Sequence, residues 1–126
     1  MCSLYFDDVE EDFPDKNLYA AKIEDIQKAI VFSRELGQQP LLIHCYAGIS
    51  RSTALAWLII FDKMRAQRFP VRRSFVILRR LRPFLMPNRH ILQLGVEILI
   101  GDSTAQQRMW REITECLDSL YEDYRT

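Results

Sequence analysis

The sequence predicts an α/β fold, in which two short strands and about five helices form one domain. Two observations support this prediction. An apolar run at 41–43 is typical of a buried strand, a longer apolar run at 53–61 is typical of a buried helix, and one short loop joins them. The chain has 126 residues, 48% of them hydrophobic, which suits a single domain with one core.

The N-terminal third is expected to contain the first strand and the first helix. Residues 3–6 form a short strand that ends at two aspartates, Asp7 and Asp8, and an acidic loop follows. Within residues 18–36 isoleucines recur at helical spacing, and Gly37 is placed to end that helix. The strand at 41–43 and the helix at 53–61 come next.

Three further helices are expected in the C-terminal half. Pro70 can start a helix in its first turn, and Pro83 closes it. Asn88 is then expected to cap a helix over 91–100. Residues 103–106 form a Ser-Thr-Ala-Gln capping box, and apolar residues at three-or-four spacing extend this last helix to about Tyr124.

The loop from His44 to Ser52 carries the clearest chemical signal, because it places Cys45 and Arg51 six positions apart. Backbone N–H groups of a strand-to-helix turn converge on its centre, and the helix N-terminus adds positive potential. A dianionic phosphate and a thiolate are both stabilised in such a place. We therefore expect a phosphate-binding loop in which Cys45 ionises readily.

The pattern His-Cys-x-x-Gly-x-x-Arg-Ser at 44–52 resembles the signature of the protein tyrosine phosphatase superfamily, in its dual-specificity branch, and is most similar to small bacterial members. The resemblance covers roughly residues 4–100 and implies a reduced parallel sheet packed by about five helices. Residues 1–126 then form a single phosphatase-like domain, with a family-like core at 1–101 and an additional helix at 102–126. Family domains have further strands before the first one here, so the sheet is expected to be reduced, rearranged, or completed by a second copy in a homodimer.

The loop contains candidate residues for nucleophilic attack, for phosphate binding and for departure of the sulfur. Cys45 attacks phosphorus as a thiolate, and Arg51 holds two phosphoryl oxygens with its planar fork. Ser52 resembles the family hydroxyl that hydrogen-bonds the sulfur and eases its departure. The expected phosphate-binding residues are Tyr46, Ala47, Gly48, Ile49, Ser50 and Arg51.

Two residues are expected to support the loop. His44 resembles the family histidine that orders the loop and tunes the thiol, although a buried, hydrogen-bonded strand histidine is an equal alternative. Asn88, in a Pro-Asn pair that resembles a family segment, is expected to brace the loop and to cap its helix. His90 is expected to face solvent.

The general acid is expected on the acidic loop. The triplet Phe-Asp-Asp at 6–8 resembles that of the small bacterial enzymes, which favours Asp8. Asp15 is the main rival, because Phe-Pro-Asp at 13–15 resembles the Trp-Pro-Asp loop of other tyrosine phosphatases. Asp7 and Asp12 have the ordinary interpretation of solvated loop charges.

The expected function is a cysteine-dependent phosphatase that hydrolyses phosphotyrosine in proteins, either alone or together with phosphoserine or phosphothreonine. One alternative is a phosphatase of small molecules, nucleotides or RNA ends, and another is a phosphate-binding module that does not hydrolyse its ligand. A sulfurtransferase or an arsenate reductase fits the loop less well. No cofactor and no metal are expected.

The resemblance implies a phosphorylated protein substrate as the partner, and the overall charge selects no other. Lys plus Arg and Asp plus Glu number 17 each, which does not favour nucleic acid. A basic run without acidic residues at 63–89 is either a solvated face or a surface that steers polyanions.

No run reaches the roughly 18 apolar residues of a membrane span. Three cysteines without paired spacing suit a reducing compartment, so a cytoplasmic location is expected.

Overall fold

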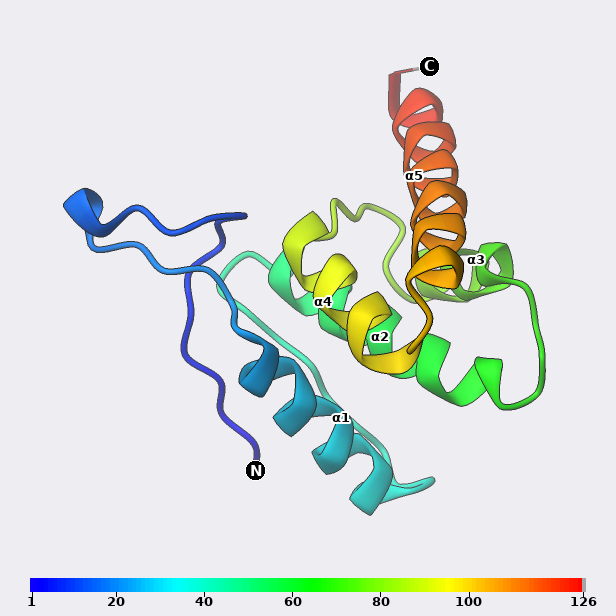
Figure 1. Ribbon diagram of the computed structural model, residues 1–126, viewed down its shortest axis with the longest axis horizontal. Helices are drawn as coiled ribbons and strands as arrows, with labels where there is room; N and C mark the ends of the chain where they lie inside the picture. The colour runs from blue at the N-terminus through cyan, green and yellow to red at the C-terminus, as the bar shows by residue number, and fades with distance from the viewer. Residues whose placement is uncertain (126) are drawn as a thin grey trace.

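The computed structural model describes residues 1–125, and in this part of the chain the ordered elements are helical. A single turn of 3₁₀-helix precedes five α-helices. Figure 1 shows α5 at one end of the molecule, and the loop with η1 projecting at the opposite end. In chain order the elements are η1 (Pro14–Lys16), α1 (Ile23–Leu36), α2 (Arg51–Arg65), α3 (Val71–Leu81), α4 (Arg89–Leu99) and α5 (Ser103–Arg125).

The predicted α/β fold with a reduced parallel sheet is wrong, because the described residues contain no β-strand. Their only strand-like pairing is an isolated antiparallel bridge between Phe13 and Leu18. Residues 3–6 and 41–43, which the sequence assigned to strands, are without regular secondary structure. A strand forms only where a second segment offers its N–H and C=O groups in register, and neither segment has such a partner among the described residues.

The prediction of about five helices is confirmed, although three of them, α1, α2 and α4, begin at other residues than predicted. The first helix begins at Ile23 rather than near residue 18, and Gly37 ends it with a φ of 61°. The capping box predicted for 103–106 is wrong, because the carboxylate of Asp102 accepts the Ala105 N–H at 2.8 Å. Asn88 caps α4 as predicted, since its side chain accepts the Ile91 N–H at 3.1 Å.

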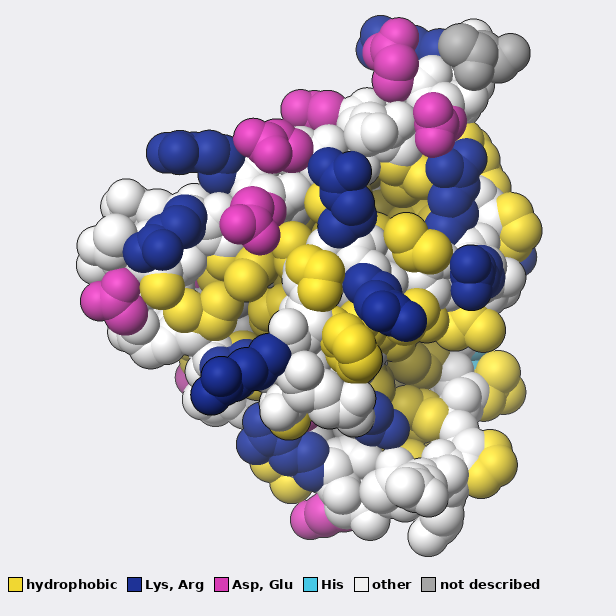
Figure 2. All heavy atoms as spheres, turned by 90° about the vertical axis from the view of Figure 1, so that its right-hand side faces the viewer, with side chains coloured by type: hydrophobic (Ala, Val, Ile, Leu, Met, Phe, Trp, Pro, Cys, Tyr) yellow, Lys and Arg dark blue, Asp and Glu magenta, His cyan; other side chains and the backbone are white. Residues whose placement is uncertain are grey.

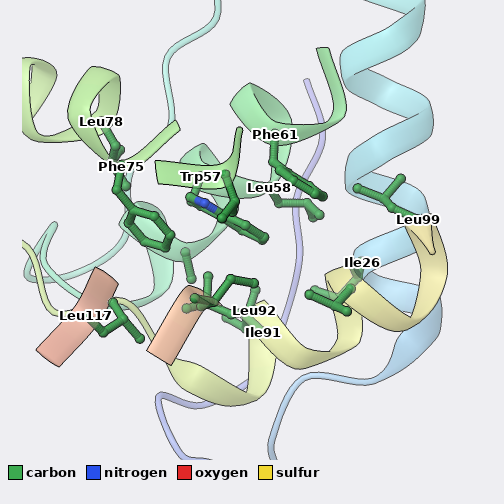
Figure 3. Packing of buried hydrophobic residues seen from close by; sticks show 14 of the residues in the cluster. Ile26, Trp57, Leu58, Phe61, Phe75, Leu78, Ile91, Leu92, Leu99 and Leu117 are labelled. Atoms are coloured by element: carbon green, nitrogen blue, oxygen red, sulfur yellow. The ribbon is translucent and has the colours of Figure 1, made fainter. Parts of the chain in front are cut away.

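Helix α2 is the centre of the core and contacts α1, α3 and α4. Figure 3 shows Trp57 of α2 among buried side chains from the surrounding helices. Its fully buried indole stacks on Phe61 at a centroid distance of 4.8 Å and on Phe75 at 5.6 Å. The indole N–H donates to the buried hydroxyl of Ser74 at 2.8 Å. The core therefore fixes the helix whose N-terminus carries the cysteine loop.

Helix α5 packs against α3 and α4 of its own chain. Ile113 and Leu117 are fully buried in this contact, so these two members of its predicted apolar stripe are covered without a second copy. Figure 2 shows the side of the molecule where α3 and α5 lie, with Lys and Arg side chains spread among hydrophobic ones. Within the described residues, no helix has the length and apolar character needed to cross a membrane.

Candidate active site

The cysteine loop runs directly into α2, whose first residue is Arg51. Gly48 makes the tight turn possible, because its φ of 70° lies in the left-handed region that favours glycine. Cys45 lines a hollow of about 480 Å³ together with Tyr46, whose side chain is almost fully exposed. The hollow is lined by Asp8, Cys45, Tyr46, Ala47, Ile49, Ser50, Arg51 and Met86.

Three donors surround the sulfur of Cys45. The N–H groups of Gly48 and Ser52 donate to Sγ at 3.2 and 3.4 Å. The hydroxyl of Ser52 lies 3.3 Å from Sγ, in position to donate once the thiol has ionised. Burial alone raises the pKa of Cys45, but these hydrogen bonds and the charge of Arg51 outweigh it and lower the pKa from 9.0 to about 7. About half of the thiol is therefore ionised near neutral pH.

Arg51 lines the same hollow as Cys45 and carries one unsatisfied donor. One terminal nitrogen, Nη1, donates to the carbonyl oxygen of Phe6 at 3.0 Å. Its Nε is buried and has no hydrogen-bond partner among the residues described. A buried N–H without an acceptor is costly, and an acceptor oxygen brought to it by a ligand would remove that cost.

The carbonyl groups of the loop are satisfied from outside by the segment at 82–88. The Nε of Arg82 donates to the carbonyl of Gly48 at 3.0 Å. The N–H groups of Met86 and Asn88 donate to the carbonyls of Ile49 and Ser50 at 3.0 and 3.1 Å. Because consecutive carbonyls are held outward in this way, the loop can turn N–H groups toward the hollow.

The supporting roles of Arg82 and Met86 are absent from the sequence predictions. Arg82 belongs to the basic run at 63–89, which gave no reason to single it out. Met86 acts through its backbone, so its residue type carries no signal. Only the three-dimensional course of the chain reveals these two contacts.

Asp8 lines the same hollow as Cys45. Its Oδ1 accepts from the hydroxyl of Ser50 at 2.7 Å and from the amide of Asn88 at 2.9 Å. Asn88 thereby links the acidic loop, the cysteine loop and the start of α4. The other carboxylate oxygen of Asp8 has no hydrogen bond within residues 1–125.

The remaining aspartates of the acidic loop do not line the hollow that contains Cys45. Asp7 and Asp12 accept the N–H groups of Tyr19 and Ala20, so they hold the loop closed and are more than solvated charges. Asp15 is exposed in η1 and does not line the hollow with Cys45.

The two histidines differ from their predicted settings. His44 is exposed, so the alternative of a buried strand histidine is wrong. Its predicted influence on the thiol has no hydrogen bond to support it among the described contacts. His90 is half-buried rather than facing solvent, with Nε2 2.7 Å from the carbonyl oxygen of Ala21. It joins α4 to the segment before α1 and lies outside the hollow.

Comparison of the chain with protein-family models, with curated proteins and with solved structures finds no match. The resemblance to tyrosine phosphatases therefore rests on the sequence motifs alone.

Proposed function

We propose that this protein is a cysteine-dependent phosphatase related to the dual-specificity tyrosine phosphatases. Its expected substrates are phosphotyrosine, and also phosphoserine or phosphothreonine, in proteins. The observation that carries the proposal is that one hollow is lined by both Arg51, whose buried Nε has no hydrogen-bond partner among the described residues, and Cys45, whose pKa is lowered to about 7. Together they supply an anion-binding donor and a nucleophile in one hollow.

The first step of the proposed reaction transfers the phosphoryl group to the enzyme. The thiolate of Cys45 attacks phosphorus and forms an S–P bond, and the P–O bond to the substrate alcohol breaks. The leaving oxygen takes a proton from the carboxyl group of Asp8. Arg51 and the N–H groups of the loop bind the equatorial oxygens, where charge is spread in the transition state.

The second step releases phosphate. Water attacks phosphorus and gives a proton to Asp8, and the S–P bond breaks to restore the thiolate. The Ser52 hydroxyl, 3.3 Å from Sγ, stabilises the departing sulfur as its charge returns. For both proton transfers Asp8 has a free carboxylate oxygen, because Ser50 and Asn88 occupy only Oδ1.

The composition of the loop favours a monophosphate ester as substrate. None of its variable positions, Tyr46, Ala47, Ile49 and Ser50, is a lysine or an arginine that would bind a second phosphate. Inositol polyphosphates are therefore expected to be poorer substrates than phosphotyrosine peptides. A cytoplasmic location is part of the proposal, because a nucleophilic thiolate requires reducing conditions.

The test is hydrolysis of para-nitrophenyl phosphate and of a phosphotyrosine peptide by the wild-type protein and two variants. Cys45→Ser should abolish turnover but retain peptide binding, whereas Arg51→Lys should lose both. Turnover by Cys45→Ser near the wild-type rate would refute the mechanism. Binding by the wild-type protein without any turnover would instead indicate a phosphate-binding module. The same assay with nucleotides as substrates tests the small-molecule alternative, which a higher kcat/KM for nucleotides than for peptides would favour.

A further inference from the structure

A second hollow adjoins the one that contains Cys45. Its volume is about 550 Å³, and it shares Asp8, Ser50 and Met86 with the first hollow. The two hollows are therefore neighbours, and these three residues lie between them. A substrate bound through its phosphate in the first hollow extends into the second only if it is larger than a simple phosphate ester.

The second hollow carries net negative charge. Glu10 and Glu11 are exposed, and neither has an ion pair or a hydrogen bond in the part of the chain that the structure describes. The one cationic side chain in the lining, Arg89, has its Nη2 3.7 Å from a carboxylate oxygen of Asp118. With Arg89 compensated in this way, the two free carboxylates determine which charge the hollow attracts.

The walls of this hollow are largely apolar. Phe13, Met86 and Tyr121 line it, and about half of the Met86 surface is exposed. The Phe13 ring already has the ammonium group of Lys16 5.7 Å from its centroid, which fits an aromatic face that attracts cations. A hollow lined by both apolar side chains and carboxylates suits a side chain with a long aliphatic stem and a positive end.

On the basis of the proposed function, we propose that this hollow binds an arginine or lysine that flanks the phosphorylated residue of a protein substrate. Adjacent residues of an extended peptide lie about 3.8 Å apart, so a residue one or two positions away can enter a hollow that shares a wall with the phosphate site. The preferred substrate is thus a phosphopeptide with a basic neighbour. Small phosphate esters leave the second hollow empty.

The experiment uses the whole protein and phosphotyrosine peptides that carry Arg, Ala or Glu at one of the two positions on either side of the phosphotyrosine. At one position at least, kcat/KM should be roughly 5- to 10-fold higher with Arg than with Glu, as expected for a few partly exposed charge pairs. In the variant Glu10→Lys with Glu11→Lys this ratio should invert. The control variant, Glu112→Lys with Glu115→Lys on the exposed side of α5, makes the same change of charge and should keep the wild-type ratio.

Two results would overturn the inference. One is equal kcat/KM for Arg and Glu at every position, and the other is a preference that both double variants change equally. Failure of the proposed function is distinguished by para-nitrophenyl phosphate, which tests the first hollow alone. If that ester is not hydrolysed, fluorescence anisotropy of the same labelled peptides measures the charge preference as binding, with the same expected ratios.

Discussion

Replacing Ser52 with alanine should raise the pKa of Cys45 by about one unit. The change removes the hydroxyl near Sγ but keeps the backbone N–H of residue 52, so one of three donors is lost. A hydrogen bond to a charged group contributes about 1.5 kcal/mol at the low end, and 1.36 kcal/mol corresponds to one pKa unit. The pKa should thus rise from about 7 to about 8.

The consequence depends on pH in a defined direction. The folded-state pKa of Cys45 lies below that of a free thiol, so the reactive thiolate is lost as pH falls through about 7 in the wild type. At pH 7 the thiolate fraction should drop from about one half to roughly one tenth in Ser52→Ala, a five-fold loss. Above about pH 9 the two proteins should react at similar rates, since both thiols are ionised there.

The assay is the rate of alkylation by iodoacetamide between pH 5 and about 10, with Cys2 and Cys116 changed to serine so that only Cys45 reacts. Ser103→Ala, an exposed serine at the start of α5, is the control and should leave the profile unchanged. A midpoint that stays near 7 in Ser52→Ala would refute this account of the thiolate. A rate that falls equally at every pH would indicate a damaged loop instead.

Three further predictions concern the acid, the core and the loop support. Asp8→Asn should lower kcat on a phosphotyrosine peptide by roughly 10²-fold, with a smaller loss of kcat on an activated aryl phosphate. Asp15→Asn should keep kcat near the wild-type value, and the opposite pattern would assign the general acid to Asp15. Ser74→Ala should cost about 1–3 kcal/mol in urea unfolding because it leaves the buried indole N–H unpaired, and an unchanged midpoint would contradict that. Arg82→Met should raise KM for para-nitrophenyl phosphate roughly 3- to 10-fold, because it removes the hydrogen bond to the Gly48 carbonyl. Arg80 is also an exposed arginine, so Arg80→Met is the control and should leave KM unchanged. Equal effects of the two substitutions would refute the role of Arg82.

The helices were predictable because their signals are local. Three-or-four spacing of apolar residues and single caps such as Gly37 and Asn88 act within a few positions of the chain. Helix α1 starts later than predicted because residues 19 and 20 are held by Asp7 and Asp12, contacts that helical periodicity does not contain. At the start of α5, Asp102 is the capping residue in place of the predicted box, because several residue types suit this position and adjacent candidates compete for it.

The strands were not predictable in this way. The apolar run at 41–43 indicated a buried strand, yet Leu42 is 84% exposed. Whether an apolar run becomes a strand depends on a partner segment elsewhere in the chain, and an apolar run alone carries no information about that partner. The prediction took the partner from the family resemblance, and the described residues do not supply it.

Contacts between residues close together in the sequence were predicted more fully than contacts between segments far apart in the chain. The contacts of Cys45 with Gly48 and Ser52 lie within one loop, where the sequence placed the three residues close together, although the contact of Ser52 with the sulfur was expected from the resemblance. The approach of Asp8 to that loop was expected only through the resemblance. The bond from Arg82 to Gly48 spans 34 positions and needs the packing of α2 and α3, so no local pattern predicts it.

The most direct test of the central claim is to trap the phosphorylated enzyme. Wild-type protein is mixed with para-nitrophenyl phosphate, quenched in acid within its first turnover, digested and analysed by mass spectrometry. We predict one added phosphoryl group on the peptide that contains Cys45, a group absent from Cys45→Ser and longer-lived in Ser52→Ala. Phosphate released at the wild-type rate with no phosphoryl group on Cys45, or with the group on another residue, would contradict the account.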